Sequence, residues 1–494
     1  MTNRKFYKYS LTEYSTGEYK MKFINRQKEL QKLEEYYTLS QRQLITVAIS
    51  GLRRVGKTTL VKKFIKNKKA LYFFVYDSKT STELLREFIE ELRHHKIITE
   101  LETIASWKIF FDLLFQRCKN YVIVLDEFQN FYSIDKSVFS ILQRACDENK
   151  STPLNLVILG SLIGLFKNIF EDKKEPLYGR IAGKLHLQPF TLPYSLETLK
   201  LLQYTEIEEM LRIYGVLGGF PKYYATIEQF NLHKKNHLEV IEYLFIQENA
   251  PLETEVTTIL KQEFGKRSSL YYSILHAIAI GKTKLNEIAS AVHMKESSIT
   301  RHLLELENKF NLIKTLRPID NRKNTRYYLS HPLIAFWFAF VYDKFSHYSL
   351  RDTKQIMNSI KEQFNTFFGW RFEEICHDFL TELNEKKKLT FQLEYLNKWW
   401  GAARIDNERQ EIEIDLIGLN QKQKKVIFTE CKWKENVNPS DILRELKEKS
   451  KHVQWQQNER EEYFCIIAKS FIKKIEEKNV LLFDLKDLQK AMIL

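Results

Sequence analysis

Cysteine is scarce in this chain, and the spacing of its cysteines excludes two kinds of site. Only five occur among 494 residues, and no two of them stand in C-x-x-C spacing. An odd number of scattered cysteines argues against a disulfide framework, and the missing C-x-x-C pairs argue against a zinc site. We interpret them as reduced thiols in hydrophobic cores: Cys118, Cys146, Cys376, Cys431 and Cys465.

The chain also lacks an apolar run that could cross a bilayer. A transmembrane helix needs about 18 or more consecutive apolar residues. The longest candidate here, residues 332–342, is too short and is typical of a buried helix. Residues 1–20 lack the apolar segment of a secretory leader. We therefore expect a cytoplasmic protein without a membrane partner.

Positive charge exceeds negative charge along the chain. The sequence contains 77 Lys and Arg against 63 Asp and Glu, a net charge of +14. This excess favours a polyanionic partner such as DNA. A solvated, lysine-rich surface is the alternative interpretation.

Residues 51–59, GLRRVGKTT, match the phosphate-binding pattern G-x-x-x-x-G-K-[ST] between an apolar strand and an amphipathic helix. Gly51 and Gly56 let the backbone turn so that successive N–H groups point at a phosphate chain. Lys57 adds a positive charge, and the hydroxyl of Thr58 can ligate Mg²⁺. The motif therefore predicts a binding site for ATP with Mg²⁺.

The first half of the chain alternates short apolar runs with helical patterns, which predicts an α/β domain with a parallel sheet. We expect its strands at residues 44–49, 71–76, 121–125, 156–159 and 184–187.

Polar residues follow two of these strands. Asp126 and Glu127 come directly after the third strand, where Asp126 would hold the Mg²⁺ shell and Glu127 would polarise the attacking water. Ser161 ends the fourth strand and would lie beside the γ-phosphate. Arg180 could stabilise charge in the transition state, and a surface salt bridge is the equal alternative.

These segments together resemble a family of archaeal and bacterial P-loop ATPases related to the MalT-type signal-transduction ATPases, a STAND and AAA-like branch. The resemblance rests on residues 23–26 with 29–30, 51–59, 126–129, 160–161, 178–180 and 218–221. It implies that Glu127 is the catalytic carboxylate, that residues 25–26 lie near the base of the nucleotide, and that the loop 218–221 closes over the nucleotide. The nucleotide contacts that we predict are Asn25, Arg26, Gly51, Arg53, Gly56, Lys57, Thr58, Thr59, Ser161 and Pro221.

A winged helix-turn-helix pattern follows the ATPase segments. Residues 285–292 and 296–310 predict two helices, and two short strands are expected at 312–316 and 326–329. Residues 281–330 contain ten Lys or Arg against five Asp or Glu, which suits a DNA backbone. An interdomain clamp is the alternative role. The DNA contacts that we predict are Ser297, Ser298, Thr300, Arg301, Arg322 and Lys323.

The C-terminal part contains a second group of acids. Two predicted strands carry Asp415 and then Glu430 with Lys432, which gives two carboxylates for a divalent metal and a lysine to orient water. Glu373, or its neighbour Glu374, is the candidate third acid. This D…E-x-K pattern resembles the PD-(D/E)XK nuclease-like domain of unknown function that accompanies such ATPases. A structural remnant without cleavage is the alternative.

We therefore predict an α/β protein with a P-loop NTPase core, a helical lid, a winged helix and a restriction-endonuclease-like domain. The expected boundaries are 1–192 for the ATPase core, 193–265 for the lid, 266–345 for the winged helix, 346–363 for a linker and 364–494 for the nuclease-like domain. The expected function is ATP hydrolysis coupled to Mg²⁺-dependent action on DNA, with catalytic residues Glu127, Arg180, Asp415, Glu430 and Lys432. The alternative is a STAND-type switch without nuclease activity, and assembly into a homo-oligomer is open.

Overall fold

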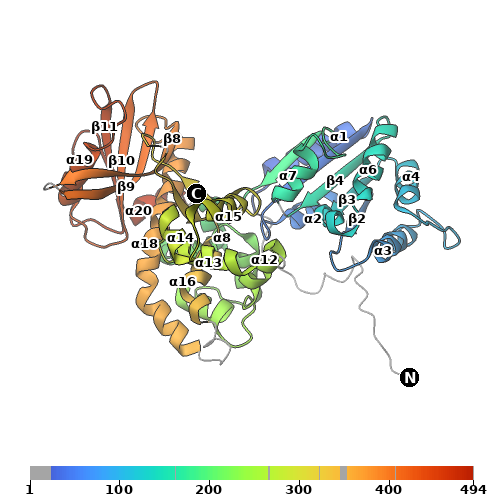
Figure 1. Cartoon of the computed structure of the whole chain (residues 1–494), viewed down its shortest axis with the longest axis horizontal. Coiled ribbons are helices and arrows are strands. Elements are labelled where there is room, and N and C mark those ends of the chain that lie inside the picture. Colours follow the sequence, from blue (N-terminus) through green and yellow to red (C-terminus); the bar gives the residue numbers. More distant parts are fainter. Residues whose placement is uncertain are drawn as a thin grey trace.

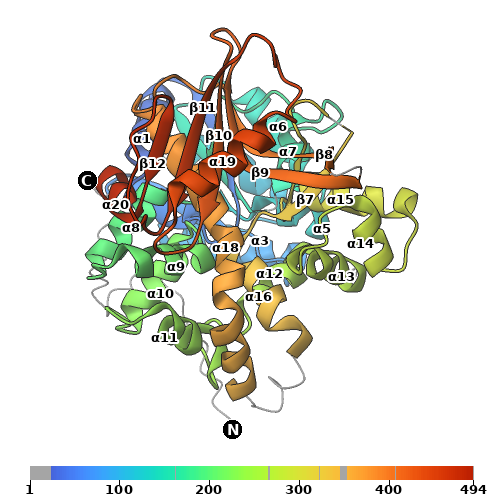
Figure 2. The same ribbon diagram turned by 90° about the vertical axis from the view of Figure 1, so that its left-hand side faces the viewer.

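The computed structural model of the protein describes residues 24–161, 163–264, 268–321, 323–344, 353–405 and 408–492. Figure 1 shows an N-terminal α/β domain, a central helical body and a C-terminal domain built on a second sheet. Figure 2 shows the long helix α18 (Thr353–Glu385) running from the helical body up to the C-terminal sheet. Among the described residues, none of the helices combines the length and the apolar content of a membrane span.

The N-terminal domain is built on a sheet in the order β2-β3-β4-β1-β5, and every pairing in it is parallel. Its strands lie close to the predicted ranges: β1 (Leu44–Gly51), β2 (Ala70–Phe74), β3 (Val122–Asp126), β4 (Leu154–Gly160) and β5 (Gly183–Leu187). The predicted α/β fold with a parallel sheet is confirmed. The carboxyl ends of β1, β3 and β4 meet at one edge of the sheet, where such folds place their ligands.

Helices cover both faces of this sheet, as the burial of a parallel sheet requires. Successive residues of β1 point to opposite sides, so Val47 and Ile49 enter one core and Ala48 enters the other. The first core includes Leu33 and Leu60, from two of the covering helices. The helices of this domain are α1 (Gln27–Ser40), α2 (Lys57–Ile65), α3 (Ser81–His94), α4 (Trp107–Arg117), the short η1 (Phe128–Asn130) and α5 (Phe131–Ile134), α6 (Ser137–Glu148) and α7 (Ile163–Glu171).

The predicted lid is helical and contains one sharp break. Its elements are α8 (Leu192–Leu201), α9 (Ile207–Leu217), α10 (Pro221–Gln229), α11 (His237–Ile241), η2 (Glu242–Ile246) and α12 (Glu255–Phe264). The break falls at residues 218–220, where Gly218 has φ 61°. A Cβ on Gly219 would lie 1.9 Å from the carbonyl oxygen of Phe190, so only glycine lets the two backbones approach.

The next segment contains α13 (Ser268–Ala279), α14 (Leu285–Ala291), α15 (Glu296–Asn308) and the antiparallel hairpin of β6 (Ile313–Leu316) and β7 (Arg326–Leu329). Both helices and both strands that the sequence predicted here are present. The buried helix α16 (Pro332–Phe340) follows, with the short η3 (Tyr342–Lys344) after it.

Residues 353–363, expected as the end of a linker, are the first part of the 33-residue helix α18. The expectation was wrong for these residues because Ile356, Met357 and Ile360 are buried in the main hydrophobic core. A helix of this length spans about 50 Å. It packs against α9 and α16 at one end and against the C-terminal sheet at the other, and so joins the two bodies.

The C-terminal domain has a mixed sheet in the order β12-β11-β10-β9-β8. The strands β8, β9 and β10 pair antiparallel, whereas β10, β11 and β12 pair parallel. The elements are β8 (Tyr395–Ile405), β9 (Glu408–Asn420), β10 (Lys425–Lys432), α19 (Pro439–Ser450), β11 (Glu461–Ala468), β12 (Val480–Phe483) and α20 (Leu485–Met492). The helix α19 connects the parallel pair β10 and β11, as a parallel crossover requires.

We predict that Gly219→Ala lowers the midpoint of thermal unfolding by about 5 °C, because overpacking costs about 1–3 kcal/mol and the new Cβ overlaps the backbone of Phe190. Gly369→Ala is the matched control, since a Cβ there meets no atom within 4 Å and Gly369 lies inside α18. The control should leave the midpoint unchanged or raise it slightly. Equal midpoints for both variants, measured by scanning calorimetry, would contradict the close approach.

Candidate functional site

The loop between β1 and α2 requires glycine at two positions. A Cβ on Gly51 would lie 2.6 Å from the carbonyl oxygen of Leu187 on β5. Gly56 caps α2 with φ 90°, a conformation that glycine adopts readily. The N-terminus of α2 therefore opens onto the loop, an arrangement that binds phosphate.

Lys57 is held inside this loop. Its Nζ donates hydrogen bonds to the carbonyl oxygens of Gly51 at 2.9 Å and of Leu52 at 3.0 Å. The residue is 6% exposed, and burial lowers the pKa of Lys57 to about 8. Because desolvation disfavours the ammonium, phosphate oxygens in the loop would stabilise its charged form.

Asp126 lies at the end of β3 and contacts the first turn of α2. The hydroxyl of Thr58 donates to its Oδ2 at 2.9 Å, and the hydroxyl of Tyr72 on β2 donates to the same oxygen. Burial raises the pKa of Asp126. A hydroxyl and a carboxylate in contact beside a phosphate loop fit a hydrated Mg²⁺. Sequence reasoning missed Tyr72, which only the pairing of β2 with β3 brings here.

Glu127 has a left-handed backbone, φ 54°, which is uncommon for a residue other than glycine. Its Oε1 accepts a hydrogen bond from Ser161 Oγ at 2.5 Å, and its Oε2 accepts one from Gln129 Nε2 at 2.5 Å. The structure thus brings Glu127 and Ser161 together from the ends of β3 and β4. A carboxylate aimed by two donors suits a general base, and such backbone strain is typical of functional sites.

The two loop arginines contact acids of α12, about 200 residues further along the chain. Arg53 lies 3.7 Å from Glu263 and 4.0 Å from Glu127. Arg54 pairs with Glu255 through Nε at 2.8 Å and Nη2 at 3.1 Å. Sequence reasoning missed both acids of α12, because two glutamates on an amphipathic helix carry no local signal. The contacts fasten the helical body to the phosphate loop.

Arg26 is buried next to the same loop. Its guanidinium donates to the carbonyl oxygens of Val55 at 3.2 Å and Gln188 at 2.5 Å, and it lies 5.2 Å from the ring centre of Phe190. The side-chain oxygen of Asn25 accepts the backbone N–H of Arg26 at 2.7 Å. Arg26 therefore holds the backbone of the loop at Val55. That Asn25 and Arg26 lie near the base of the nucleotide stays a prediction.

Two further predicted contacts differ in their placement. Pro221 borders the loop, since a Cβ on Gly56 would lie 4.0 Å from Pro221 Cγ. Thr59 follows Thr58 in α2 and is exposed. Their contacts to nucleotide stay predictions.

Arg180 takes the alternative that the sequence left open. Its Nη2 lies 3.1 Å from Asp147 Oδ2 on α6, and its Nη1 donates to the carbonyl oxygen of Tyr178 at 2.7 Å. Neither partner belongs to the phosphate loop. In this structure Arg180 therefore forms a salt bridge with Asp147, and its role in the transition state stays a prediction.

The C-terminal acids meet on neighbouring strands. Asp415 on β9 and Glu430 on β10 lie side by side in the register that pairs Leu416 with Thr429. Asp415 Oδ2 accepts the backbone N–H of Cys431 at 2.8 Å. Burial, together with the nearby carboxylates of Glu373 and Glu430, raises the pKa of Asp415 to about 7.

Lysines neutralise the other acids of this group. Glu430 accepts Lys432 at 2.6 Å and Lys449 at 3.1 Å, while Glu373 pairs with Lys398. Among the described residues, no three His, Cys, Asp or Glu side chains converge on a point that could hold a metal. As arranged here, the residues of this group do not fit a divalent metal.

Glu374 belongs to a different contact. It pairs with Lys314 of β6 at 2.9 Å and with Arg371 of its own helix. Burial alone would raise its pKa, but Arg371 and Lys314 hold the pKa of Glu374 at about 2. Glu374 therefore joins α18 to the hairpin through its ion pair with Lys314.

The hairpin β6–β7 packs against β8 and β9 of the C-terminal sheet (Figure 2). Arg326 is 6% exposed, pairs with Glu413 at 2.6 Å and with Glu411, and lies 4.7 Å from the ring of Trp400. Trp399 Nε1 donates to Asp320 Oδ1 at 2.9 Å. The hairpin is therefore an interdomain contact in this structure.

The first turns of α15 lie outside that contact. Ser297, Ser298 and Arg301 are exposed, whereas Thr300 is half-buried and donates to the carbonyl oxygen of Glu296 at 2.8 Å. Lys323 is exposed, and Arg322 lies outside the described residues.

The loop, Asp126, Glu127 and Ser161 at one edge of a parallel sheet define the site of a P-loop ATPase. Residues 23–227 match the family described as an ATPase domain predominantly from Archaea. Residues 337–452 match DUF234, described as archaeal and bacterial proteins of unknown function.

An uncharacterized protein of Methanocaldococcus jannaschii is 31% identical to this chain over 476 residues, which cover 94% of this chain and 99% of that protein. The chain belongs to the same family as that protein. An uncharacterized ATP-binding protein of the same organism is 49% identical over 47 residues, covering 10% of this chain and 76% of that protein. The Walker-type ATPase of Pyrococcus abyssi shares the fold, with TM-score 0.50 and 23% identity over 64% of this chain and 95% of its own.

We predict that Glu127→Gln lowers kcat for ATP hydrolysis about 10²- to 10⁴-fold, the usual contribution of a general base. Nucleotide affinity should not fall, because the amide keeps the shape that Ser161 and Gln129 hold and no longer competes with phosphate for Arg53. Arg180→Ala is the control, since its salt bridge to Asp147 predicts kcat within a few-fold of wild type. A loss of kcat with Arg180→Ala as large as that with Glu127→Gln, in a steady-state phosphate-release assay, would contradict this division of roles.

Proposed function

We propose that the protein is an ATP-driven switch that binds DNA through helix α15. The exposed first turns of α15, on a body that also contacts the nucleotide site, carry the proposal. The side chain of Arg301 is 79% exposed, and Ser297 and Ser298 lie one turn before it. The order of α13, α14 and α15 followed by a hairpin is that of a winged helix, whose last helix enters the major groove.

The charge of this segment supports the same partner. Residues 281–330 carry ten Lys or Arg against five Asp or Glu. Arg326 and Lys284 are used in ion pairs with the C-terminal domain. The proposed DNA contact therefore rests on α15 and its flanks, while the hairpin serves as the clamp.

The ATPase site supplies the proposed drive. When bound, Mg²⁺ and ATP would supply the phosphoryl group and a charge that polarises it. Thr58 and Asp126 would hold the metal, and Lys57 would pair with phosphate oxygens. Glu127 would take a proton from water, a role supported by the hydrogen bonds of Ser161 and Gln129 to its two oxygens.

Such a protein would act as a STAND-type regulatory ATPase, the branch to which MalT belongs. The lysine pairs on Glu430 and Glu373 favour a holding role for the C-terminal domain over cleavage. Mg²⁺-dependent nuclease activity is the second candidate, supported by the adjacency of Asp415 and Glu430 on neighbouring strands with Lys432 close by, and it requires Lys432 and Lys449 to release Glu430. Either function is compatible with assembly of the chain into a homo-oligomer.

We predict that Arg301→Ala weakens binding to duplex DNA several-fold. It should also lower the slope of log affinity against log salt concentration by about one, as the loss of one phosphate contact does. Arg144→Ala on α6 is the control, because it removes an equal charge from an exposed site of the ATPase domain. Fluorescence anisotropy at several salt concentrations measures both effects. Equal losses for the two variants, or no binding by wild type, would contradict the proposed DNA contact.

Cleavage separates the two candidates for the C-terminal domain. Duplex, branched and single-stranded DNA are incubated with Mg²⁺ or Mn²⁺, with and without ATP. We expect intact DNA throughout, because lysines occupy the acids that a metal needs. Cleavage by wild type that disappears in both Asp415→Asn and Lys432→Ala would establish the nuclease instead.

A further inference from the structure

Arg53 of the phosphate loop is shared by two carboxylates from different parts of the chain. One is Glu127, 4.0 Å away, and the other is Glu263 of α12, 3.7 Å away. The side chain of Glu263 is only 8% exposed. An acid in this position opposes a bound polyphosphate, because both would compete for the same cations.

The described charged groups that act on Glu263 come from each element packed against it. They are Arg53 and Lys57 of the loop and α2, Glu127 after β3, and Lys309 after α15. Burial raises the pKa of Glu263 to about 7, and the carboxylate of Glu127 adds to the rise, whereas the three cations oppose it. Additional negative charge from phosphate would disfavour the ionised form of Glu263 further.

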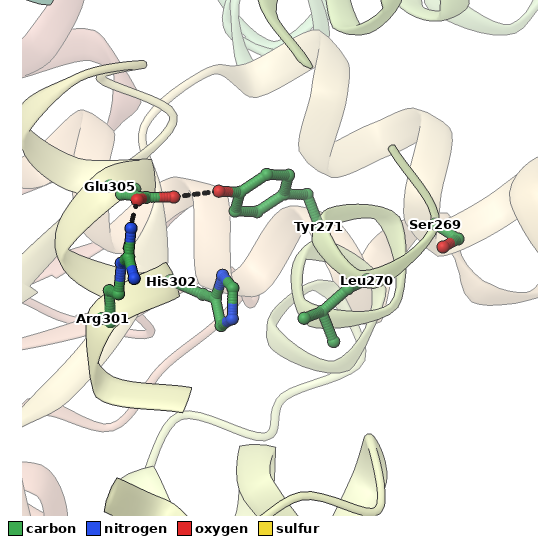
Figure 3. Close-up of a pocket in the computed structure, with 6 residues that line it drawn as sticks. All are labelled: Ser269, Leu270, Tyr271, Arg301, His302 and Glu305. Atoms are coloured by element: carbon green, nitrogen blue, oxygen red, sulfur yellow. Dashed lines mark hydrogen bonds and ion pairs between the residues drawn. The ribbon is translucent and has the colours of Figure 1, made fainter. Parts of the chain in front are cut away.

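The residue after Glu263 contacts the winged-helix segment. The ring centre of Phe264 lies 4.7 Å from that of Tyr271 on α13 and 5.1 Å from that of Phe310, just after α15. Figure 3 shows the hydroxyl of Tyr271 aimed at Glu305, whose other side faces Arg301. The contacts therefore run from α12 through Tyr271 to the exposed arginine of α15.

A second contact joins the same two regions. The backbone N–H of Gly164 on α7, three residues after Ser161, donates to the carbonyl oxygen of Lys309 at 3.3 Å. A Cβ on Gly164 would lie 2.6 Å from Lys309 Cα, so the backbones are in close contact. Ser161, which holds Glu127, and Glu263, which holds Arg53, are thus each followed in the chain by a residue that contacts Lys309 or Phe310.

We propose that Glu263 is the positioning residue through which α12 senses the nucleotide. Glu263 pairs with Arg53 while the site lacks a triphosphate. When a triphosphate binds, its oxygens replace Glu263 as the partner of Arg53. Glu263, left among added negative charge, must then gain a proton or move away with α12. A movement of α12 carries Phe264 against Tyr271 and so shifts α15. The shift can be measured without DNA, whereas its role in DNA binding rests on the proposed function.

Nucleotide affinity tests the first step. We expect Glu263→Gln to bind a non-hydrolysable ATP analogue about tenfold tighter than wild type at pH 8, within the usual range of coupling between sites. Glu255→Gln is the matched control, since it loosens the same helix through Arg54 without removing charge beside Glu127. An unchanged affinity in Glu263→Gln, or an equal gain in both variants, would overturn the proposal.

The pH dependence separates charge from packing. Binding that disfavours the ionised carboxylate is accompanied by proton uptake, so wild-type affinity should fall as pH rises through about 7. Glu263→Gln lacks this component, so the two proteins should converge at pH 6 and differ most at pH 8. A constant ratio of affinities from pH 6 to pH 8 would assign Glu263 a purely structural role and contradict the proposal.

A reporter on α15 tests the second step without DNA. A fluorophore on Leu304→Cys is selective, because Leu304 is exposed and the native cysteines are buried. We expect the ATP analogue to change its emission in wild type, and not in Tyr271→Phe, which keeps the ring but loses the bond to Glu305. An identical response in Tyr271→Phe, or none in wild type, would overturn the path. Failure of DNA binding alone would leave this result standing and would refute only the proposed function.

Discussion

The ion pairs that Arg53 makes with Glu127 and Glu263 are the interaction on which the arrangement of this molecule depends. They place the charge of the phosphate loop between the expected base and a helix of the neighbouring body. Because these side chains are largely buried, their charges interact more strongly than surface pairs do. A ligand that adds negative charge at the loop acts on this balance, and through it the proposed coupling would reach the helical body.

The C-terminal domain is held by a different set of contacts. α18 buries an apolar face against the helical body and carries Glu374, which pairs with Lys314 of the hairpin β6–β7. Arg326 fastens the same hairpin to β9 and stacks on Trp400. A cavity of about 340 Å³ lies between these elements, lined by Lys284, Arg371, Glu373 and Lys398 among others. Movement of α14 or the hairpin would therefore change the surroundings of Glu373, whose carboxylate acts on Asp415.

Local patterns were sufficient to predict the strands of the ATPase sheet, the phosphate loop and the residues at the ends of β3 and β4. These features are specified by short runs, since an apolar strand followed by a motif needs no distant partner. The pairing of Lys449 with Glu430 and of Lys398 with Glu373, the salt bridge of Arg180 and the contacts of the acids of α12 join segments distant in the chain, which a single sequence does not mark. The expected linker failed for a related reason: the apolar stripe of residues 356–360 is recognisable only once α18 is seen to continue through it.

A distance measurement between the ATPase domain and α15 tests whether the nucleotide site is coupled to α15. Spin labels on Lys108→Cys in α4 and Leu304→Cys in α15, both at exposed positions, would report the separation of the ATPase domain and α15. We expect the distribution of distances to shift when a non-hydrolysable ATP analogue binds, and we expect no shift in Lys57→Ala, which lacks the ammonium of the phosphate loop. The same distribution with and without the analogue, in a wild-type protein shown to bind it, would contradict coupling between the nucleotide site and α15.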